Sequence, residues 1–278
     1  MKNKSDGKAR KLYFVKFGGS VITNTKKRST AKVHEIDRLL KEVDEARTLR
    51  GFDVIIGHGS GSFAHVPAKK YKVNEGLKYS NSMKGSVITL KEAANLDNIV
   101  VDRAMKLGIP VFPFSAHSFG MFEAGHMSPI FIDGIKAALR QGFIPIVYGD
   151  VVIDKNKGVS IASTEEILVG LSKKLKPNKI ILGTDVDGVF TKDPRVHKDA
   201  KLIRRLDKSN FKMGIAGTGD SVGRANVTGG MQGKLMALYK AISRVGATGY
   251  IINAATPGNV KKVLLGEDKK IKCTVVCA

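Results

Sequence analysis

The chain contains no tryptophan and only two cysteines, and it lacks a long apolar run. A membrane-spanning helix needs roughly 18 to 20 consecutive apolar residues, and no segment approaches that length. The first residues, MKNKSDGKARK, carry charge but no apolar core of the kind that signal peptides have. We therefore expect a cytoplasmic protein that has no membrane partner.

The two cysteines do not have the neighbours that a metal site requires. Cys273 and Cys277 stand in the segment IKCTVVCA, with no histidine or further cysteine beside them. Structural zinc sites are built from four such ligands. We therefore predict free thiols and assign no metal ligand to the chain.

Acidic residues are also scarce. The chain has 25 of them and 47 lysines and arginines, which gives a net charge of +22. A basic protein attracts polyanions such as nucleic acids. The basic residues are, however, scattered in short groups with few aromatic residues among them, and no helix-turn-helix, RNP or zinc-finger pattern is present. We expect no specific nucleic-acid partner and interpret the charge as a lysine-rich surface that also attracts small anions.

Strand-like apolar runs alternate along the chain with segments whose apolar residues have helical spacing. The predicted strands are residues 11–17, 53–56, 109–114, 143–148, 179–182 and 248–253, and the predicted helices are residues 33–50, 91–107, 132–141, 165–175 and 233–245. This alternation predicts an α/β fold in which helices cover both faces of a mostly parallel sheet. Because no linker divides the chain, we predict one domain over residues 11–278 behind a flexible tail of residues 1–10.

The first glycine-rich loop follows the first predicted strand. In the segment KFGGS, Lys16 lies at the end of the strand. The turn after it is opened by Gly18, Gly19 and Ser20. Glycines let backbone N–H groups approach phosphate oxygens without a Cβ in the way. Paired glycines after a strand are also ordinary turn chemistry, so this motif alone does not establish a phosphate site.

The second loop, GHGSGSFAH, places three glycines, two serines and two histidines directly after a strand. We expect His65 to lie where the next helix begins, so that its imidazole can hold an anion together with the backbone donors of the loop. Gly59 and Ser60 belong to the same loop. For His58, which lies nearer the strand end, we favour a structural hydrogen-bonding role over contact with substrate.

Two further motifs lie in the C-terminal half. The segment GTDVDGVFTKDP resembles a fragment of a calcium-binding loop, but the remaining ligands are absent and Asp-Gly is also typical of a turn. The segment NVTGGMQGK places Lys234 just inside a predicted helix. A lysine at a helix N-terminus is electrostatically unfavourable unless an anion meets it, which favours a phosphate partner over the alternative of a solvated surface lysine.

The four motifs KFGGS, GHGSGSFAH, GTDVDGVFTKDP and VTGGMQGK, in this order, resemble the amino acid kinase family from about Leu12 onward. Within it, the loop with Ser-Phe-x-His and the following AKKY are similar to those of isopentenyl phosphate kinases, and the fosfomycin kinases share much of the pattern. The resemblance implies a three-layer αβα sandwich, an acceptor lobe over about residues 11–175, a nucleotide lobe over about residues 176–278, and a homodimer. It also implies ATP as co-substrate with Mg²⁺.

The resemblance further implies roles for individual residues. Lys16 would contact the phosphoryl group in flight, and His65 would hold the acceptor's phosphate. Lys234 would contact the ATP end, and Asp150 would orient the lysines or the metal-bound nucleotide. The other residues that it assigns to the acceptor are Gly18, Gly19, Gly59 and Ser60. Those that it assigns to the nucleotide, with Lys16 and Lys234, are Ser20, Thr184, Asp185, Asp187, Gly188, Val189, Phe190, Lys192, Gly229 and Gly230.

The chain departs from the family pattern in two places. The lysine expected after the first loop is matched by Lys26 or Lys27 in TNTKKR, and we take Lys26 for the acceptor. Where the family has a Gly-Asp step at the start of a helix, this chain reads ASTEE, so Thr164 and Glu165 stand in its place. A glutamate there could bridge two lysines, with a longer reach than an aspartate.

The resemblance implies ATP-dependent phosphorylation of isopentenyl phosphate to the diphosphate, for isoprenoid biosynthesis. A phosphate monoester with a second pKa of about 6 is already mostly ionised near neutral pH, so no general base is required. The enzymatic alternative is a kinase for another small phosphate or phosphonate such as fosfomycin, and the non-enzymatic one is a basic nucleotide-binding or nucleic-acid-binding module. An apolar tail could contact residues between Met83 and Val101, although these also fit an ordinary helix core.

Overall fold

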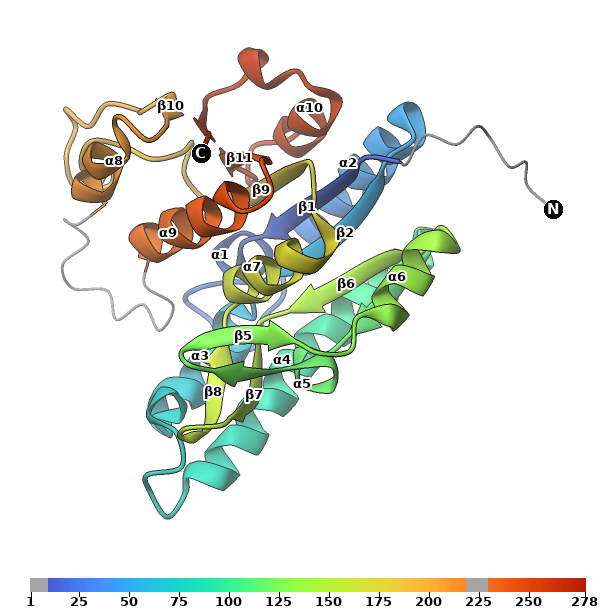
Figure 1. Ribbon diagram of the computed structural model, residues 1–278, viewed down its shortest axis with the longest axis vertical. Helices are drawn as coiled ribbons and strands as arrows, with labels where there is room; N and C mark the ends of the chain where they lie inside the picture. Colours follow the sequence, from blue (N-terminus) through green and yellow to red (C-terminus); the bar gives the residue numbers. More distant parts are fainter. Residues whose placement is uncertain (1–9, 219–229) are drawn as a thin grey trace.

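A computed structural model describes residues 10–218 and 230–278, and in these residues an eight-stranded sheet forms the centre of the molecule (Figure 1). In order across the sheet, its strands are β10 (Arg205–Leu206), β12 (Cys273–Val276), β11 (Thr248–Asn253), β9 (Lys179–Thr184), β1 (Leu12–Phe17), β2 (Asp53–His58), β6 (Ile144–Tyr148) and β3 (Val111–Phe114). Neighbouring strands run parallel, except that β11 and β12 are antiparallel.

Helices cover both faces of this sheet. Side chains from α2 (Val33–Arg50), α4 (Ser82–Lys106) and α10 (Asn259–Leu265) belong to the hydrophobic core on one face. Side chains from α6 (Asp133–Arg140), α7 (Thr164–Leu175), α8 (Phe211–Gly217) and α9 (Gly230–Ser243) contribute to the core on the other, which α7 and α9 cover at the front of Figure 1. The predicted α/β fold with helices on both faces of a mostly parallel sheet is confirmed.

Strand β1 shows how one sequence supplies both cores. Successive side chains of a strand point to opposite faces, so Tyr13, Val15 and Phe17 enter the core with α2, whereas Phe14 enters the core with α7. Lys16 alternates in the same way and shares the face of Phe14. The strand therefore directs this lysine toward α7.

A smaller sheet lies beside α4 and was not predicted from the sequence (Figure 1). Its strands, in order, are β5 (His126–Pro129), β4 (Gly120–Glu123), β7 (Asp150–Asp154) and β8 (Gly158–Ala162). The remaining elements are α1 (Gly19–Ile22), α3 (Gly61–Lys70), α5 (Ala116–Phe119) and two short 3₁₀ helices, η1 (Val73–Glu75) and η2 (Asp268–Lys270). The strands of this sheet are only four or five residues long, which is too short for a clear alternating pattern.

Most predicted elements occur within a few residues of their expected bounds. The helix predicted over residues 33–50 matches α2, but the helix predicted over residues 91–107 begins earlier, at Ser82. Its first turns were missed because Met83 and Val87 are 70% and 66% exposed, so apolar spacing there does not mark a buried face. These two side chains therefore lie on the surface, outside the hydrophobic cores.

Three further expectations concern the chain as a whole. Both cysteines are free thiols, as predicted, with Cys273 buried and Cys277 partly buried. Among the described residues no helix is long and apolar enough to cross a membrane. The tail predicted over residues 1–10 lies outside the described residues, apart from Arg10. The single domain over residues 11–278 stays a prediction.

Candidate active site

Three glycine-bearing loops meet at one edge of the large sheet. Strands β9, β1 and β2 are parallel neighbours, so their carboxyl ends lie together, which is where open α/β sheets bind ligands. A Cβ on Gly18 would lie 2.6 Å from the backbone oxygen of Gly183. A Cβ on Gly19 would lie 2.7 Å from the backbone of Gly61. The chain needs glycine at these positions because the loops approach each other backbone to backbone.

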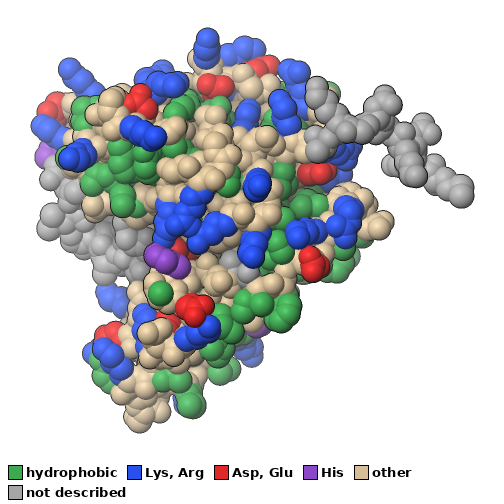
Figure 2. Space-filling model, viewed as in Figure 1, with side chains coloured by type: hydrophobic (Ala, Val, Ile, Leu, Met, Phe, Trp, Pro, Cys, Tyr) green, Lys and Arg blue, Asp and Glu red, His purple; other side chains and the backbone are tan. Residues whose placement is uncertain are grey.

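These loops form one wall of a cleft with a volume of about 810 Å³. Figure 2 shows lysine and arginine side chains gathered across the middle of the face in view. The cleft brings together most of the residues singled out in the sequence, namely Lys16, Gly18, Gly19, Ser20, Lys26, Gly59, Ser60, His65, Asp150, Thr164, Glu165, Thr184, Asp185, Gly230 and Lys234. Their types make the cleft suited to a ligand that carries negative charge.

The floor of the cleft holds a buried ion pair. Lys16 Nζ lies 3.2 Å from the Oε1 atom of Glu165, and the two side chains are 5% and 9% exposed. Glu165 stands in the first turn of α7, where the side chain of Ser163 accepts a hydrogen bond from the backbone N–H of Glu166. The N-terminus of a helix also favours a carboxylate. Burial raises the pKa of Glu165, but the positive charges of Lys16 and Lys234 outweigh this and hold it below its ordinary value.

Lys234 contributes a second cation from the first turns of α9. Its Nζ donates a hydrogen bond of 3.2 Å to the backbone oxygen of Gly230. Burial lowers the pKa of Lys234, the charge of Glu165 opposes this shift, and the charge of Lys16 adds to it. Glu165 therefore pairs directly with Lys16 and acts on Lys234 through its charge, and its role as a bridge between the two lysines stays a prediction.

His65 is the fifth residue of α3, so the prediction that it lies where this helix begins is wrong by about one turn. The helix begins at Gly61, whose positive φ of 47° is a conformation that glycine adopts readily. The ring of His65 is open to solvent on one side and protein surrounds it elsewhere. This desolvation lowers the pKa of His65, and the charges of Lys16 and Lys234 lower it further. An anion bound beside it would have the opposite effect.

Asp150 lines the cleft, but its hydrogen bonds differ from those expected. Its Oδ2 accepts from His117 Nδ1 at 2.7 Å and from the His117 backbone at 3.3 Å, and its Oδ1 accepts from Val151 N at 2.8 Å. These contacts hold the carboxylate against α5 and its own strand. The carboxylate that meets Lys16 is that of Glu165 instead.

His58 has the structural role that the sequence favoured. Its ring is fully buried, with Nε2 3.0 Å from the Oδ1 atom of Asp97 on α4. It also stacks on Tyr148, with ring centroids 5.6 Å apart. The neighbouring loop residue Gly59 faces the cleft, so His58 ties this loop to α4.

The segment expected to cradle the nucleotide only partly faces the cleft. Thr184 and Asp185 line it, as does Val186. Asp187 accepts a hydrogen bond from Asn253, and Val189 is fully buried in the core. The other residues assigned there and absent from the cleft wall are Gly188 against Thr274, Phe190 bridged to Leu202, and Lys192 paired with Asp199. Gly229 lies outside the described residues.

Lys27, the alternative to Lys26 in the sequence, also lines the cleft, so the choice between the two lysines is not forced by position. Three other cleft residues were not singled out in the sequence, and Arg28 is one of them. Ser62 also lines it, and among the described residues its hydroxyl is the one buried side-chain oxygen or nitrogen without a hydrogen-bond partner. Arg195 reaches the cleft from just beyond the third motif. The run of basic residues TNTKKR was a signal for Lys27 and Arg28, and the serines of the second loop were a signal for Ser62.

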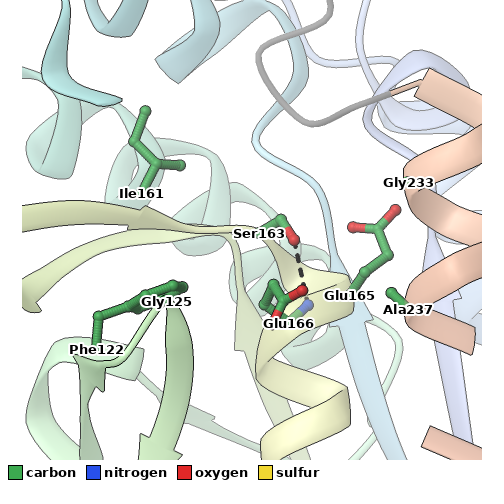
Figure 3. Close-up of a pocket in the computed structure, with 8 residues that line it drawn as sticks. All are labelled: Phe122, Gly125, Ile161, Ser163, Glu165, Glu166, Gly233 and Ala237. Carbon is green, nitrogen blue, oxygen red and sulfur yellow. Dashed lines mark hydrogen bonds between the residues drawn. The ribbon is translucent and has the colours of Figure 1, made fainter. Parts of the chain in front are cut away.

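A smaller cavity of about 210 Å³ adjoins the cleft at Glu165 (Figure 3). Figure 3 shows Gly233 and Ala237 of α9 on one side of Glu165, and Gly125 and Phe122 of the small sheet on the other. Among residues 10–218 and 230–278 there is no group of three or more histidine, cysteine or acidic side chains that could hold a metal ion. The basic side chains on the cleft wall outnumber the acidic ones, with Lys16, Lys26, Lys27, Arg28, Arg195 and Lys234 against Asp150, Glu165 and Asp185.

The fold and the cleft define a known class of protein. The model of the amino acid kinase family matches residues 11–253, and the chain belongs to this family. It is 34% identical to an isopentenyl phosphate kinase of Methanothermobacter thermautotrophicus, over 92% of this chain and 96% of that protein. The isopentenyl phosphate kinase of Thermoplasma acidophilum is 33% identical, over 90% and 94%. Crystal structures of an isopentenyl phosphate kinase superpose with a TM-score of 0.79 at 31% identity, covering 95% of this chain and 99% of that one.

Proposed function

We propose that this protein transfers the terminal phosphoryl group of ATP to isopentenyl phosphate and so forms isopentenyl diphosphate and ADP. The observation that carries the proposal is the cleft in which Lys16, Lys234 and His65 converge on the glycine loops. Similarity to isopentenyl phosphate kinases along more than nine-tenths of the chain supports the choice of acceptor.

The main obstacle to this reaction is repulsion between two anions. Like unit charges 4 Å apart repel by about 1 kcal/mol in water and by more in a partly dry cleft. Lys16 would supply a cation to the phosphoryl group in transfer, and Glu165 holds its ammonium group at a distance of 3.2 Å. Lys234 supplies a second cation from α9. The catalytic contribution of these groups is alignment and charge neutralisation.

The acceptor's own phosphate would lie beside His65 and the loop of Gly59 and Ser60. In the free protein, desolvation and the nearby lysines lower the pKa of His65, and a bound phosphate dianion would favour its protonated form. An oxygen of this phosphate attacks the γ-phosphorus of ATP, the bond from that phosphorus to the ADP oxygen breaks, and ADP leaves. No proton has to be removed from the acceptor, because its phosphate is already ionised.

The apolar part of the cleft offers a place for an isoprenoid tail. Its wall is built from small side chains of two packed helices, Ala64 and Ala68 of α3 and Ala93 of α4. The exposed Met83 and Val87, which the sequence had offered for this role, lie outside it. We place the five-carbon tail against the alanines.

We expect Mg²⁺ to be bound mainly by the nucleotide phosphates, and not by a complete set of protein ligands. Mg²⁺ keeps several waters and is usually bound by substrate phosphates with one or two carboxylates. Asp185 lines the nucleotide side of the cleft and is the residue we assign to such a contact. When bound, the ion would neutralise part of the charge on the ATP phosphates.

The homodimer and the division into an acceptor lobe and a nucleotide lobe are part of the same proposal. The family resemblance supports both. A particle in solution of twice the chain mass of 30.0 kDa, measured by light scattering, is the expected result for the dimer.

The activity is tested by incubating the purified protein with Mg-ATP and one acceptor at a time, and by measuring ADP. The acceptors are isopentenyl phosphate, dimethylallyl phosphate, fosfomycin, uridylate and acetylglutamate, and the Lys16→Ala variant is the control for contaminating kinases. We expect the highest kcat/KM with isopentenyl phosphate. Preference for fosfomycin would replace the acceptor while keeping the mechanism, and no ADP with any acceptor would overturn the proposal.

A further inference from the structure

Thr23 is fully buried between the first two glycine loops and has been assigned no role so far. It follows α1, the single helical turn Gly19–Ile22, and opens the basic segment TNTKKR. Among the described residues that line the cleft, Thr23 is absent. It can therefore act on a bound ligand only through its neighbours.

The hydroxyl group of Thr23 bonds to both loops. Its Oγ1 atom donates a hydrogen bond of 2.7 Å to the backbone oxygen of Gly19, in the first loop. The same atom accepts a hydrogen bond of 3.1 Å from the backbone N–H of Ser62, in the second loop. A hydroxyl group has one donor and two acceptor sites, so it can make both bonds at once. One side-chain atom thus joins the two loops.

The packing around Thr23 leaves the loops little room to shift. Where they leave the sheet, the Gly59 N–H donates to the Phe17 oxygen at 3.0 Å, and Thr23 joins them again three residues further on. A Cβ on Gly61 would collide with the Thr23 hydroxyl and lie 2.9 Å from the Gly19 oxygen. The buried N–H of Ser62 would lose its partner if the loops moved apart, which costs free energy.

Ser62 also holds the far end of the basic segment. Its backbone oxygen accepts a hydrogen bond of 3.2 Å from the N–H of Ser29, while its own N–H donates to Thr23. Lys26 and Lys27 lie between these two attachment points, and both line the cleft. The contact between Thr23 and Ser62 therefore bears on the basic segment as well as on the loops.

We propose that Thr23 is a positioning residue for phosphoryl transfer, because its hydroxyl sets the spacing between the loop beside Lys16 and the loop that leads to His65. This inference rests on the proposed function, in which the acceptor's phosphate is held between these loops. Reacting atoms must lie about 3–3.5 Å apart and in line, and a misplacement of about 1 Å can cost about 100-fold in rate. A bond that fixes the loop spacing therefore acts on the rate without touching a reactant.

Steady-state kinetics with isopentenyl phosphate and Mg-ATP test the assignment. Thr23→Val keeps the shape of the side chain but removes both hydrogen bonds of the hydroxyl. It should lower kcat/KM for the acceptor about tenfold or more and leave the KM for ATP within about twofold, because Thr184 and Asp185 lie on another segment. Thr23→Ser keeps the hydroxyl and should retain most of the kcat/KM.

Thr30→Val is the matched control. The Thr30 hydroxyl donates a 2.9 Å hydrogen bond to the Arg28 oxygen, so the bond stays within one segment and joins no two loops. This variant should have the kcat/KM of the unaltered protein. Urea unfolding of every variant ensures that the rates refer to folded protein. If Thr23→Val does not fold, Thr23→Cys replaces it, because a thiol is only a weak donor and acceptor.

The possible results separate this inference from the proposed function. Equal kcat/KM of the unaltered protein and of the variant without the hydroxyl would overturn the inference alone. An equal loss in Thr23→Ser and Thr23→Val would also overturn it, because packing of the methyl group would then be the cause. A similar rise in KM for both substrates would indicate a general structural role instead. If the unaltered protein formed no ADP with any acceptor, the proposed function would fail, and this inference with it.

Discussion

Replacing Glu165 with glutamine is expected to destabilise the free protein. At an effective dielectric constant of about 20, unit charges at the 3.2 Å that separates Lys16 Nζ from Glu165 Oε1 attract by about 5 kcal/mol. Glutamine keeps the size of the side chain but removes its charge, so Lys16 remains buried without a counter-ion and close to Lys234. Removing one partner of a buried pair costs about 3–5 kcal/mol, and we expect the free energy of unfolding to fall by this amount.

Urea unfolding of four proteins measures this effect: the unaltered chain, Glu165→Gln, Lys16→Met and the double variant. Because the two side chains act on each other, the double variant should lose less stability than the sum of the two single losses. Added ATP or inorganic phosphate should recover more stability for Glu165→Gln than for the unaltered protein, since a bound anion replaces the missing charge. Glu166→Gln is the matched control, one residue along, and should change stability by no more than about 0.5 kcal/mol.

The same carboxylate predicts a dependence of stability on pH. The folded pKa of Glu165 lies below the ordinary value of 4.5 because Lys16 and Lys234 outweigh the effect of burial. As the pH falls below about 4.5, the unfolded chain takes up a proton that folded Glu165 resists, so its contribution to stability is lost as the pH falls through its folded pKa. Glu165→Gln should therefore be less sensitive to acid in this range.

Two results would refute this reasoning. One is an equal free energy of unfolding for Glu165→Gln and the unaltered protein in the absence of ligand. The other is strict additivity in the double variant, which would show that the two charges do not act on each other. A glutamine variant that is destabilised but gains nothing from phosphate would restrict the role of Glu165 to folding.

Three further predictions concern single residues of the cleft. Lys16→Ala should lower kcat by about 100-fold or more in the ADP assay, run where circular dichroism shows the variant folded; a smaller loss would remove Lys16 from the transfer step. His65→Ala should raise the KM for the acceptor and leave the KM for ATP unchanged, and an unaltered acceptor KM would contradict its assigned role. Gly18→Ala places a Cβ 2.6 Å from the Gly183 oxygen, so thermal unfolding should show a loss of about 1–3 kcal/mol; unchanged stability would mean that the loops can separate.

Much of the fold can be predicted from the sequence because its strands and helices have clear periods. The helix over Val33–Arg50 and the strand over Thr248–Asn253 match their predicted bounds. The smaller sheet could not be predicted, because β4 and β5 have four residues each and exist as strands only through their partners. The local sequence pattern is weak in strands that form only because they pair with another strand.

The candidate site divides in the same way. Glycines after strands identify the loops, and parallel strands bring such loops to one edge, so Gly18, Gly59 and Gly183 could be expected to meet. The motifs do not predict which side chains contact one another. The resemblance implied that Asp150 orients the lysines or the metal-bound nucleotide, and in the structure its carboxylate accepts a hydrogen bond from His117 of α5. Val189 stood in a nucleotide motif and is a core residue.

The sequence by itself determined the family motifs, the parallel α/β arrangement and the surplus of cations, because these depend on residue type and short-range spacing. Tertiary structure alone decided that Lys16 meets Glu165. The alternation of β1 directs the lysine to one face, and the packing of α7 on that face brings a carboxylate 149 positions later to within 3.2 Å. It likewise decided that Arg195 reaches the cleft, because hydrogen bonds to distant segments, not its own neighbours, set the path of its loop.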